Sequence, residues 1–341
     1  MIHFDCDYME GAHPLIMSRL LETNLEQTPG YGTDCYSTHA RELIRAECGC
    51  PDAEVHFLVG GTQANSTIID GVLRRGEGVV SADTGHINVH ESGAVELGGH
   101  KVLPLPNNNG KISGTQLRGF LQGFFADETY EHMVIPGMVY ISNPTEFGTL
   151  YSLEELEDIS AACHENNLRL FMDGARLGYG LAAKGNNLTL KDIARLCDVF
   201  YIGGTKVGAL FGEAVVIPRP GLIPHLFTVI KEHGALLAKG RLAGIQFETL
   251  FTDGLYYRIG EHAVRLAQRL KQIFVEKGYE VYIDSPTNQQ FFILPNETID
   301  RLKQDVTFEL WGARGETCTP VRFVTSWATK PEDVEKLAGL L

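Results

Sequence analysis

Residues 197–217 read CDVFYIGGTKVGALFGEAVVI, and Lys206 stands between the two apolar runs of this stretch. Both runs are rich in β-branched and aromatic residues, which predicts the strands Val199–Ile202 and Ala214–Ile217. A lysine between two such strands is badly placed to solubilise the surface, but desolvation there keeps its amine reactive. The stretch therefore predicts two strands of a buried sheet with a nucleophilic lysine between them.

A second apolar run, LRLFMDGAR at residues 168–176, ends its expected strand at Asp173. An aspartate in this position could cap a helix, or it could face a protonated ring nitrogen. Pyridoxal phosphate is bound by a lysine Schiff base together with a carboxylate partner for its pyridine nitrogen. Lys206 and Asp173 together therefore predict a pyridoxal phosphate site, with both residues catalytic.

Short β-rich runs alternate with helical patterns from about residue 55 to residue 217. This alternation is typical of right-handed βαβ units, so we expect an α/β fold with a mostly parallel sheet and helices on both faces. The other candidate strands are Val55–Val59, Val79–Ser81, Met138–Ser142 and Leu168–Met172. Ser152 and Glu155 are spaced as a capping box before an amphipathic helix.

The C-terminal part reads as a smaller α+β unit. A long helical stretch runs from about Arg241 to Gly278, and candidate strands follow at Tyr279–Ile283, Gln290–Leu294 and Val321–Trp327. We expect an N-terminal arm over residues 1–40, a large cofactor-binding domain over 41–245 and a small domain over 246–341.

The 341 residues carry a formal net charge of −14 at pH 7. Such a charge repels nucleic acid and anionic membranes, so neither is an expected partner. No apolar run approaches the roughly 18 residues of a membrane span, and the acidic N-terminus is unlike a signal peptide. Seven scattered cysteines, an odd number, indicate reduced thiols. We therefore expect a cytoplasmic protein.

Chemically capable residues cluster just after the expected strands, at Gly60–Asn65, His86, Asn143, Asp173 and Lys206. The carboxyl ends of parallel strands share one edge of an open sheet, and ligands bind there. The five junctions therefore predict one site at this edge.

Several of these residues have a plain structural explanation beside the functional one. The GGTQAN motif at 60–65 opens a helix whose N-terminus can bind a phosphate through Gly61 and Thr62, or it is a tight turn. His86 could stack on a cofactor ring or move a proton, or be an ordinary loop histidine. His86, His90 and Glu91 lack a further ligand cluster, so we expect no metal site.

Thr205 can give its hydroxyl to a phosphate, and Arg176 could pair with a phenolic oxygen of the cofactor or with Asp173. Arg322 lies in a candidate strand, where an unpaired charge would be costly. Either an internal carboxylate or the α-carboxylate of a substrate would satisfy it.

Together the motifs GGTQAN, DGARLG, GGTK, KGRLAG and VRFVTSW resemble those of the threonine aldolase family over nearly the whole chain. This family belongs to the β-eliminating lyase group of pyridoxal phosphate enzymes, with the fold type I architecture of aspartate aminotransferase. The resemblance implies that Lys206 forms the Schiff base and that Asp173 pairs with the ring nitrogen of the cofactor. It implies further that Arg176 contacts the phenolate and that His86 stacks on the ring. Gly61, Thr62 and Thr205 would contact the phosphate.

Three further roles follow from the resemblance. Arg241 is similar to an arginine that reaches the phosphate from a neighbouring subunit, and Tyr31 to an interfacial tyrosine at the substrate. Arg322 matches the arginine that holds the substrate carboxylate. These roles imply a homodimer or homotetramer with its active site at the subunit interface.

The chain departs from the family pattern at two places. Cys6, in FDCDYMEG, stands where a serine or small amide usually helps to bind the carboxylate. The stretch SNPTEFGT at 142–149 offers Thr145 or Glu146 where familiar members have a histidine near the substrate β-hydroxyl. We take Cys6 and Glu146 as candidate substrate-binding residues.

The resemblance implies cleavage of a β-hydroxy-α-amino acid, L-threonine or L-allo-threonine, to glycine and an aldehyde. A base, such as a water held by His86 or Glu91, would remove the β-hydroxyl proton. A β-eliminating lyase or an aminotransferase acting on another amino acid would use the same site. A binding protein without catalytic activity on the same sheet is the remaining alternative.

Overall fold

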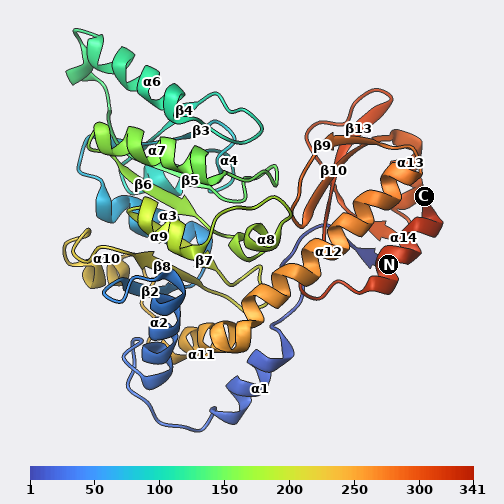
Figure 1. The fold of residues 1–341 in the computed structure, drawn as a ribbon, viewed down its shortest axis with the longest axis horizontal. Coiled ribbons are helices and arrows are strands. Elements are labelled where there is room, and N and C mark those ends of the chain that lie inside the picture. Colours follow the sequence, from blue (N-terminus) through green and yellow to red (C-terminus); the bar gives the residue numbers. More distant parts are fainter.

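The computed structural model describes residues 1–341, and its largest element is a seven-stranded sheet (Figure 1). The strands lie in the order β2-β8-β7-β6-β5-β3-β4. Their bounds are β2 Glu54–Leu58, β3 Glu77–Ala82, β4 Lys101–Leu105, β5 Ile135–Ser142, β6 Arg169–Asp173, β7 Val199–Gly203 and β8 Glu213–Ile217. Only β8 runs antiparallel to its neighbours, β7 and β2. The prediction of an α/β fold with a mostly parallel sheet is confirmed.

Helices cover both faces of this sheet because alternate residues of its buried strands face opposite sides. In β5, Val139 and Ile141 belong to one core, whereas Met138 and Tyr140 belong to the other. The larger core includes residues of α1 Pro14–Glu22, α2 Cys35–Cys48, α6 Gly114–Ala126, α7 Leu153–Glu165, α8 Leu177–Ala182, α9 Leu190–Leu196 and α11 Arg241–Phe251. The other core includes residues of α3 Gly61–Val72, α4 His86–Val89, α5 Ala94–Leu97 and α10 Leu226–Glu232.

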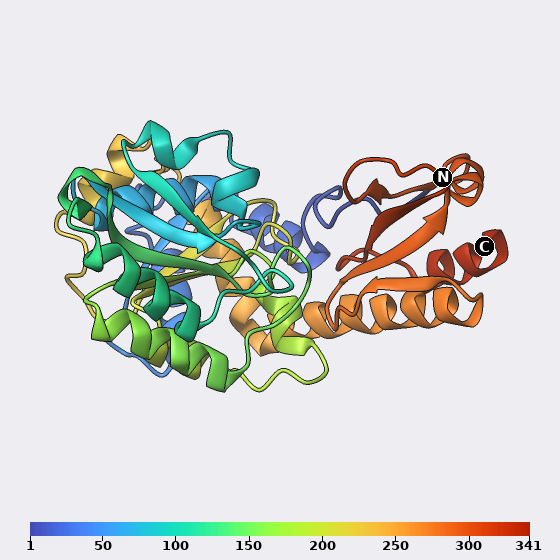
Figure 2. The ribbon, with the colours of Figure 1, turned by 90° about the horizontal axis from the view of Figure 1, so that it is seen from above.

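A smaller unit follows, built on a four-stranded antiparallel sheet in the order β12-β13-β10-β9. Figures 1 and 2 show α12 Leu255–Glu276 leaving the large unit and running along this sheet. The remaining elements are β9 Glu280–Ile283, β10 Gln289–Pro295, α13 Asn296–Leu302, β11 Val306–Thr307, β12 Glu309–Leu310, β13 Cys318–Val324 and α14 Pro331–Leu340. The expected C-terminal α+β unit is therefore present.

The N-terminal residues join the small unit before they reach the large one. Strand β1 Ile2–His3 pairs in parallel with β11, and Phe4 is fully buried in the core of the small unit. Both chain ends consequently lie in that unit in Figure 1. The division of the chain at residues 40 and 245 stays a prediction.

Two local features differ from the sequence-based expectations. The edge strand β4 was not expected, and its KVLPL sequence contains Pro104, which a sheet tolerates at its edge. The helical stretch beginning at Arg241 is broken at Thr252–Gly254, where Asp253 and Gly254 both adopt positive φ. The capping box of Ser152 and Glu155 forms at the start of α7, as expected.

The carboxyl ends of β3, β5, β6 and β7 point to the same edge of the large sheet. Strand β2 also ends there, because it runs antiparallel to β8 and β8 runs antiparallel to β7. None of the helices combines the length and the apolar character needed to cross a membrane.

Candidate active site

A cavity of about 150 Å³ lies at the carboxyl edge of the large sheet, where the sequence predicts a site. The carboxyl ends of five strands and the start of β8 supply its lining, which consists of Gly60, Gly61, Thr62, His86, Ser142, Pro144, Thr145, Glu146, Asp173, Ala175, Arg176, Tyr201, Thr205, Lys206 and Glu213. The structure thus brings Lys206, Asp173, His86, Arg176, Gly61, Thr62, Thr205 and Glu146 together around one cavity.

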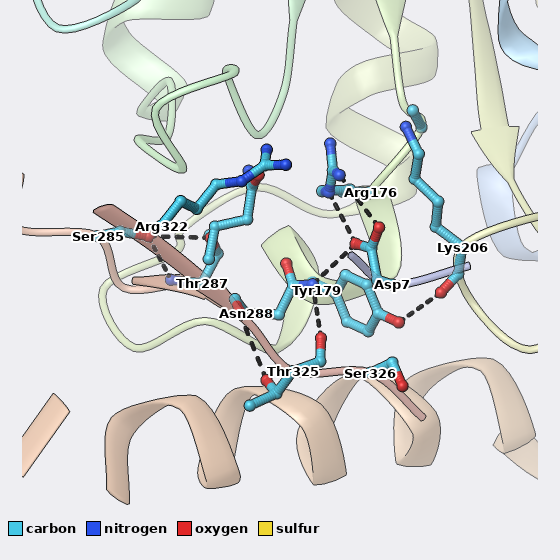
Figure 3. A network of polar contacts seen from close by, with 12 residues as sticks. Asp7, Arg176, Tyr179, Lys206, Ser285, Thr287, Asn288, Arg322, Thr325 and Ser326 are labelled. Carbon is cyan, nitrogen blue, oxygen red and sulfur yellow. Dashed lines mark hydrogen bonds and ion pairs between the residues drawn. The ribbon is translucent and has the colours of Figure 1, made fainter. Parts of the chain in front are cut away.

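Lys206 lies in the turn that follows β7, with its side chain buried against the cavity (Figure 3). Tyr179 holds this turn by donating its hydroxyl to the Lys206 carbonyl oxygen at 2.5 Å. Burial lowers the pKa of the Lys206 amine, and the Arg176 guanidinium lowers it further. A lowered pKa increases the share of uncharged, nucleophilic amine near neutral pH.

Asp173 is buried at the end of β6 and accepts three hydrogen bonds. Tyr140 donates its hydroxyl to Oδ2 at 2.6 Å, and Asn65 donates its amide to the same oxygen at 3.2 Å. The backbone N–H of Ala175 donates to Oδ1 at 2.9 Å. Burial alone would raise the pKa of Asp173, but His86 and the hydrogen-bond donors outweigh it and hold that pKa below its usual value. The group remains an anion, as a partner of a protonated ring nitrogen must.

His86 is fixed by a buried acid on its own loop. The Oε1 atom of Glu91 lies 2.7 Å from His86 Nδ1 and accepts a 2.7 Å hydrogen bond from the Asn65 amide. Since a carboxylate oxygen only accepts hydrogen bonds, Nδ1 is the donor in this pair. The same Asn65 amide group thereby links Glu91 to Asp173.

Glu146 faces the cavity from the loop after β5. Its Oε1 atom accepts hydrogen bonds from the His86 backbone N–H at 3.0 Å and from the Ser142 hydroxyl at 2.7 Å. Burial raises the pKa of Glu146, and the Ser142 hydrogen bond offsets part of that rise. The cavity therefore contains a carboxyl group that is a stronger base than an ordinary glutamate.

Arg176 lines the cavity but is paired with Asp7, which the sequence did not single out. Its Nε and Nη2 atoms donate to the buried Asp7 carboxylate at 2.7 and 3.0 Å, and the Asn288 amide donates to the same group at 2.9 Å. Figure 3 shows this network between the two units of the chain. Asp173 is not the partner of Arg176.

Arg322 lies outside the cavity lining. It forms an ion pair with Glu309 and donates to Gln289 Oε1 at 2.8 Å, and its guanidinium carbon lies 5.1 Å from the centre of the Trp311 ring. In Figure 3 the Arg322 guanidinium group, the Arg176 guanidinium group and the Lys206 amine all point to the same side. Of the two sequence-based alternatives, the internal carboxylate is therefore present in this chain.

The other candidates lie away from the cavity. Cys6 is half-buried next to Asp7. Arg241 donates to the carbonyl oxygens of Glu26 and Thr23, and Tyr31 lines a separate surface pocket of about 460 Å³. That larger pocket contains no lysine and no buried acid, so it lacks the groups for the predicted chemistry.

The comparisons with known proteins agree with this geometry. A model of the family described as beta-eliminating lyase matches residues 9–288. The structure superposes on a threonine aldolase of Leishmania major with a TM-score of 0.96 and 42% identity, covering 100% of this chain and 98% of the other. The chain is also 29% identical to the low specificity L-threonine aldolase of Pseudomonas aeruginosa over 98% of its own length and 95% of the relative's.

The chain belongs to the threonine aldolase group of the β-eliminating lyase family. The resemblance inferred from its motifs is thereby confirmed. A Thermus thermophilus aspartate aminotransferase variant, at 15% identity, superposes with a TM-score of 0.72 over all of this chain and 92% of that chain. This similarity confirms the expected fold type I architecture.

The side chains present fit the cofactor expected for this aldolase group. The cavity combines a buried amine, a buried anion and the N-terminus of α3, and a Cβ atom on Gly61 would lie 3.0 Å from the Tyr201 hydroxyl. Three buried atoms at the site, Asn65 Oδ1, Glu91 Oε2 and Glu213 Oε2, have no hydrogen-bond partner within the chain. No group of three or more His, Cys, Asp or Glu side chains is arranged to hold a metal ion.

Asp7, Tyr140 and Glu213 are the site residues that the sequence did not reveal. Tyr140 lies within an apolar strand and reads as a core residue, and Asp7 is distant from its partner Arg176 in the sequence. Glu213 carries a usable signal, because an acid at the start of a fully buried strand requires an explanation.

Asp7→Asn is expected to destabilise the protein by about 3–5 kcal/mol, because it leaves the Arg176 charge buried without a counter-ion. The pKa of Asp7 is lowered, since the Arg176 and Lys206 charges outweigh the opposite effect of burial. The contribution of Asp7 is therefore present above its ordinary pKa near 4 and is lost as the pH falls through the folded value.

Urea unfolding at pH 7 would measure this loss. Asp300→Asn is the matched control, because it removes the partner of Arg314 from an exposed pair and should leave the unfolding midpoint unchanged. Equal midpoints for wild type and Asp7→Asn would contradict the structural importance of the buried pair.

Proposed function

We propose that this chain is a pyridoxal phosphate-dependent aldolase that cleaves L-threonine or L-allo-threonine to glycine and acetaldehyde. The observation that carries this proposal is the single cavity that joins the Lys206 amine, the Asp173 anion and the α3 N-terminus. The family membership and the similarity to threonine aldolases support the same activity.

Lys206 would hold the cofactor aldehyde covalently, and the Asp173 carboxylate would pair with the ring nitrogen. Gly61 and Thr62 at the α3 N-terminus would receive the phosphate, because free backbone N–H groups and the helix dipole favour an anion. His86, whose ring Glu91 orients, would stack on the cofactor ring. When bound, pyridoxal phosphate accepts the electron pair of the bond that breaks at the substrate α-carbon.

Arg322 binds the substrate α-carboxylate. Glu309, whose side chain is 42% exposed at the edge of the small sheet, forms an ion pair with the Arg322 guanidinium group in this structure. A carboxylate ligand can replace it, because the Arg322 Nε atom is buried without a partner and can complete a bidentate contact. Holding the carboxylate fixes which α-carbon bond stands perpendicular to the cofactor ring.

Glu146 accepts the β-hydroxyl proton of the substrate. Its raised pKa makes it a better base than an ordinary carboxylate, and both of its hydrogen bonds use Oε1, which leaves Oε2 for the substrate. Glu91 is less suited to this role, because its side chain is fully buried and does not line the cavity.

Tyr31 and Arg241 complete the site of a neighbouring copy. Both lie apart from the cavity of their own chain, and Tyr31 is nearly half exposed. A homodimer, or a tetramer built from such dimers, would place them at the partner's phosphate and substrate. The seven free cysteines support a reducing, cytoplasmic setting for this assembly.

The purified protein is expected to release glycine and acetaldehyde in equal amounts from L-threonine or L-allo-threonine without a second substrate. A β-eliminating lyase would instead yield ammonia and a keto acid, and an aminotransferase would require a keto-acid acceptor. Product analysis after incubation separates the three activities. Ammonia with a keto acid as the sole products would contradict the proposal.

Glu146→Gln should lower kcat/KM for the aldol cleavage by roughly 100- to 10 000-fold while retaining the cofactor absorbance, because the amide cannot accept the proton. Ser142→Ala keeps the base but removes a hydrogen bond that lowers its pKa. The acidic limb of the kcat/KM profile should therefore move to higher pH in Ser142→Ala. Wild-type kcat/KM in Glu146→Gln would exclude Glu146 as the base.

Mixing two inactive variants tests the shared site. Lys206→Ala removes the amine, and Arg241→Ala removes the arginine assigned to the neighbouring copy. A mixed dimer contains one site with both residues intact. When the two chains are unfolded and refolded together and pair at random, about half of the dimers are mixed, so up to about a quarter of wild-type activity should return. Absence of any recovery, with mixed dimers present by native mass spectrometry, would place Arg241 outside a shared site.

A further inference from the structure

Glu213 is a buried acid in the cavity that the proposed aldol chemistry does not use. It begins β8, opposite Gly203 of β7 and Leu58 of β2, and so lies between the turn of Lys206 and the chain entering α3. The Thr205 hydroxyl donates to its Oε1 atom at 2.9 Å and accepts a 3.0 Å hydrogen bond from the Gly212 backbone N–H. Its Oε2 atom is buried and has no partner.

The cavity around Glu213 is suited to bind an anion but contains few positively charged side chains. Gly60, Gly61 and Thr62 line the same cavity, and Lys206 and Arg176 are its only lysine and arginine. Arg176 is committed to Asp7. An ionised Glu213 at this position would repel a phosphate at the α3 N-terminus.

The charge state of Glu213 follows from the groups that face it. The pKa of Glu213 is raised to about 8, because burial, together with the Asp173 charge, outweighs the lowering by Lys206 and by the Thr205 hydroxyl. The phenols of Tyr201 in β7 and Tyr256 in α12 also face it, and both have pKa values raised far above neutrality by burial. Burial therefore favours the protonated form of the carboxyl group, and an anion beside it would favour that form further.

We propose that Glu213 serves as a neutral acid whose Oε2–H donates a hydrogen bond to the cofactor phosphate. Thr205 donates to Oε1, which leaves the proton on Oε2, the atom without a partner in the chain. Thr205 then supports the phosphate through Glu213 rather than by its own hydroxyl. This inference rests on the proposed cofactor but not on the identity of the amino acid that the enzyme cleaves.

The test compares pyridoxal phosphate with pyridoxal, which lacks the phosphate, on the full chain freed of cofactor. The ratio of their dissociation constants isolates the phosphate contribution, because the pH dependence of the Lys206 linkage is common to both. In wild type the phosphate advantage should fall by roughly tenfold or more between pH 7 and pH 9.5, as the donor is lost. Above pH 7 the phosphate group itself is largely dianionic, since its second pKa is near 6.

Two variants provide matched controls. Glu213→Gln keeps a donor of the same shape and removes the titration, so its phosphate advantage should stay within about threefold of the wild-type value at pH 7 and remain flat to pH 9.5. Glu213→Leu removes the donor and should lose roughly tenfold or more at pH 7. Inorganic phosphate, used alone as a competitor at pH 7, should likewise bind wild type and Glu213→Gln more tightly than Glu213→Leu.

Two results would overturn the proposal. A wild-type phosphate advantage that does not change with pH would show that Glu213 gives no titrating donor. A stronger phosphate advantage in Glu213→Gln than in wild type at pH 7 would show an ionised, repelling carboxylate. Failure of wild type to bind either pyridoxal phosphate or pyridoxal would contradict the proposed function itself, and this proposal with it.

Discussion

The burial of the Lys206 amine beside acids is the interaction on which the rest of the structure depends. A lysine in a nonpolar interior loses its charge unless acids compensate it, and acids buried alone become protonated. Asp7 and Asp173 both act to hold the charge on Lys206, whereas burial and Arg176 act against it. The result is an amine with a lowered pKa inside a stable fold.

The three carboxyl groups that line the cavity have different pKa shifts because they accept different numbers of hydrogen bonds. Asp173 accepts hydrogen bonds from Tyr140, Asn65 and Ala175, and its pKa is lowered despite complete burial. Glu213 accepts one side-chain hydrogen bond, from Thr205, and burial dominates its pKa. Glu146 lies between these cases, so that one cavity can hold a permanent anion, a base and a neutral acid.

Much of this arrangement follows from local sequence, and the remainder depends on contacts between distant segments. The strands around Lys206 and Asp173 could be predicted because they are short apolar runs that end in polar turns. Strand β4 could not be predicted, since its proline is disfavoured in strands and hides the strand pattern of the sequence. The pairing of Asp7 with Arg176 joins segments far apart in the sequence, and no local pattern at Cys6 or Asp7 indicates it. The sequence predicts a carboxylate partner for Arg322, either internal or from a substrate, but no local pattern identifies Glu309 as the internal one.

The most direct test of this account is the site at which the cofactor is attached. Borohydride reduction of the holoenzyme converts the lysine linkage into a stable bond, and peptide mass spectrometry then locates the modified residue. We predict that the pyridoxyl phosphate group is found on Lys206, within the peptide that contains GGTK. Modification of another lysine, or of none in protein that carries the cofactor, would contradict the central claim.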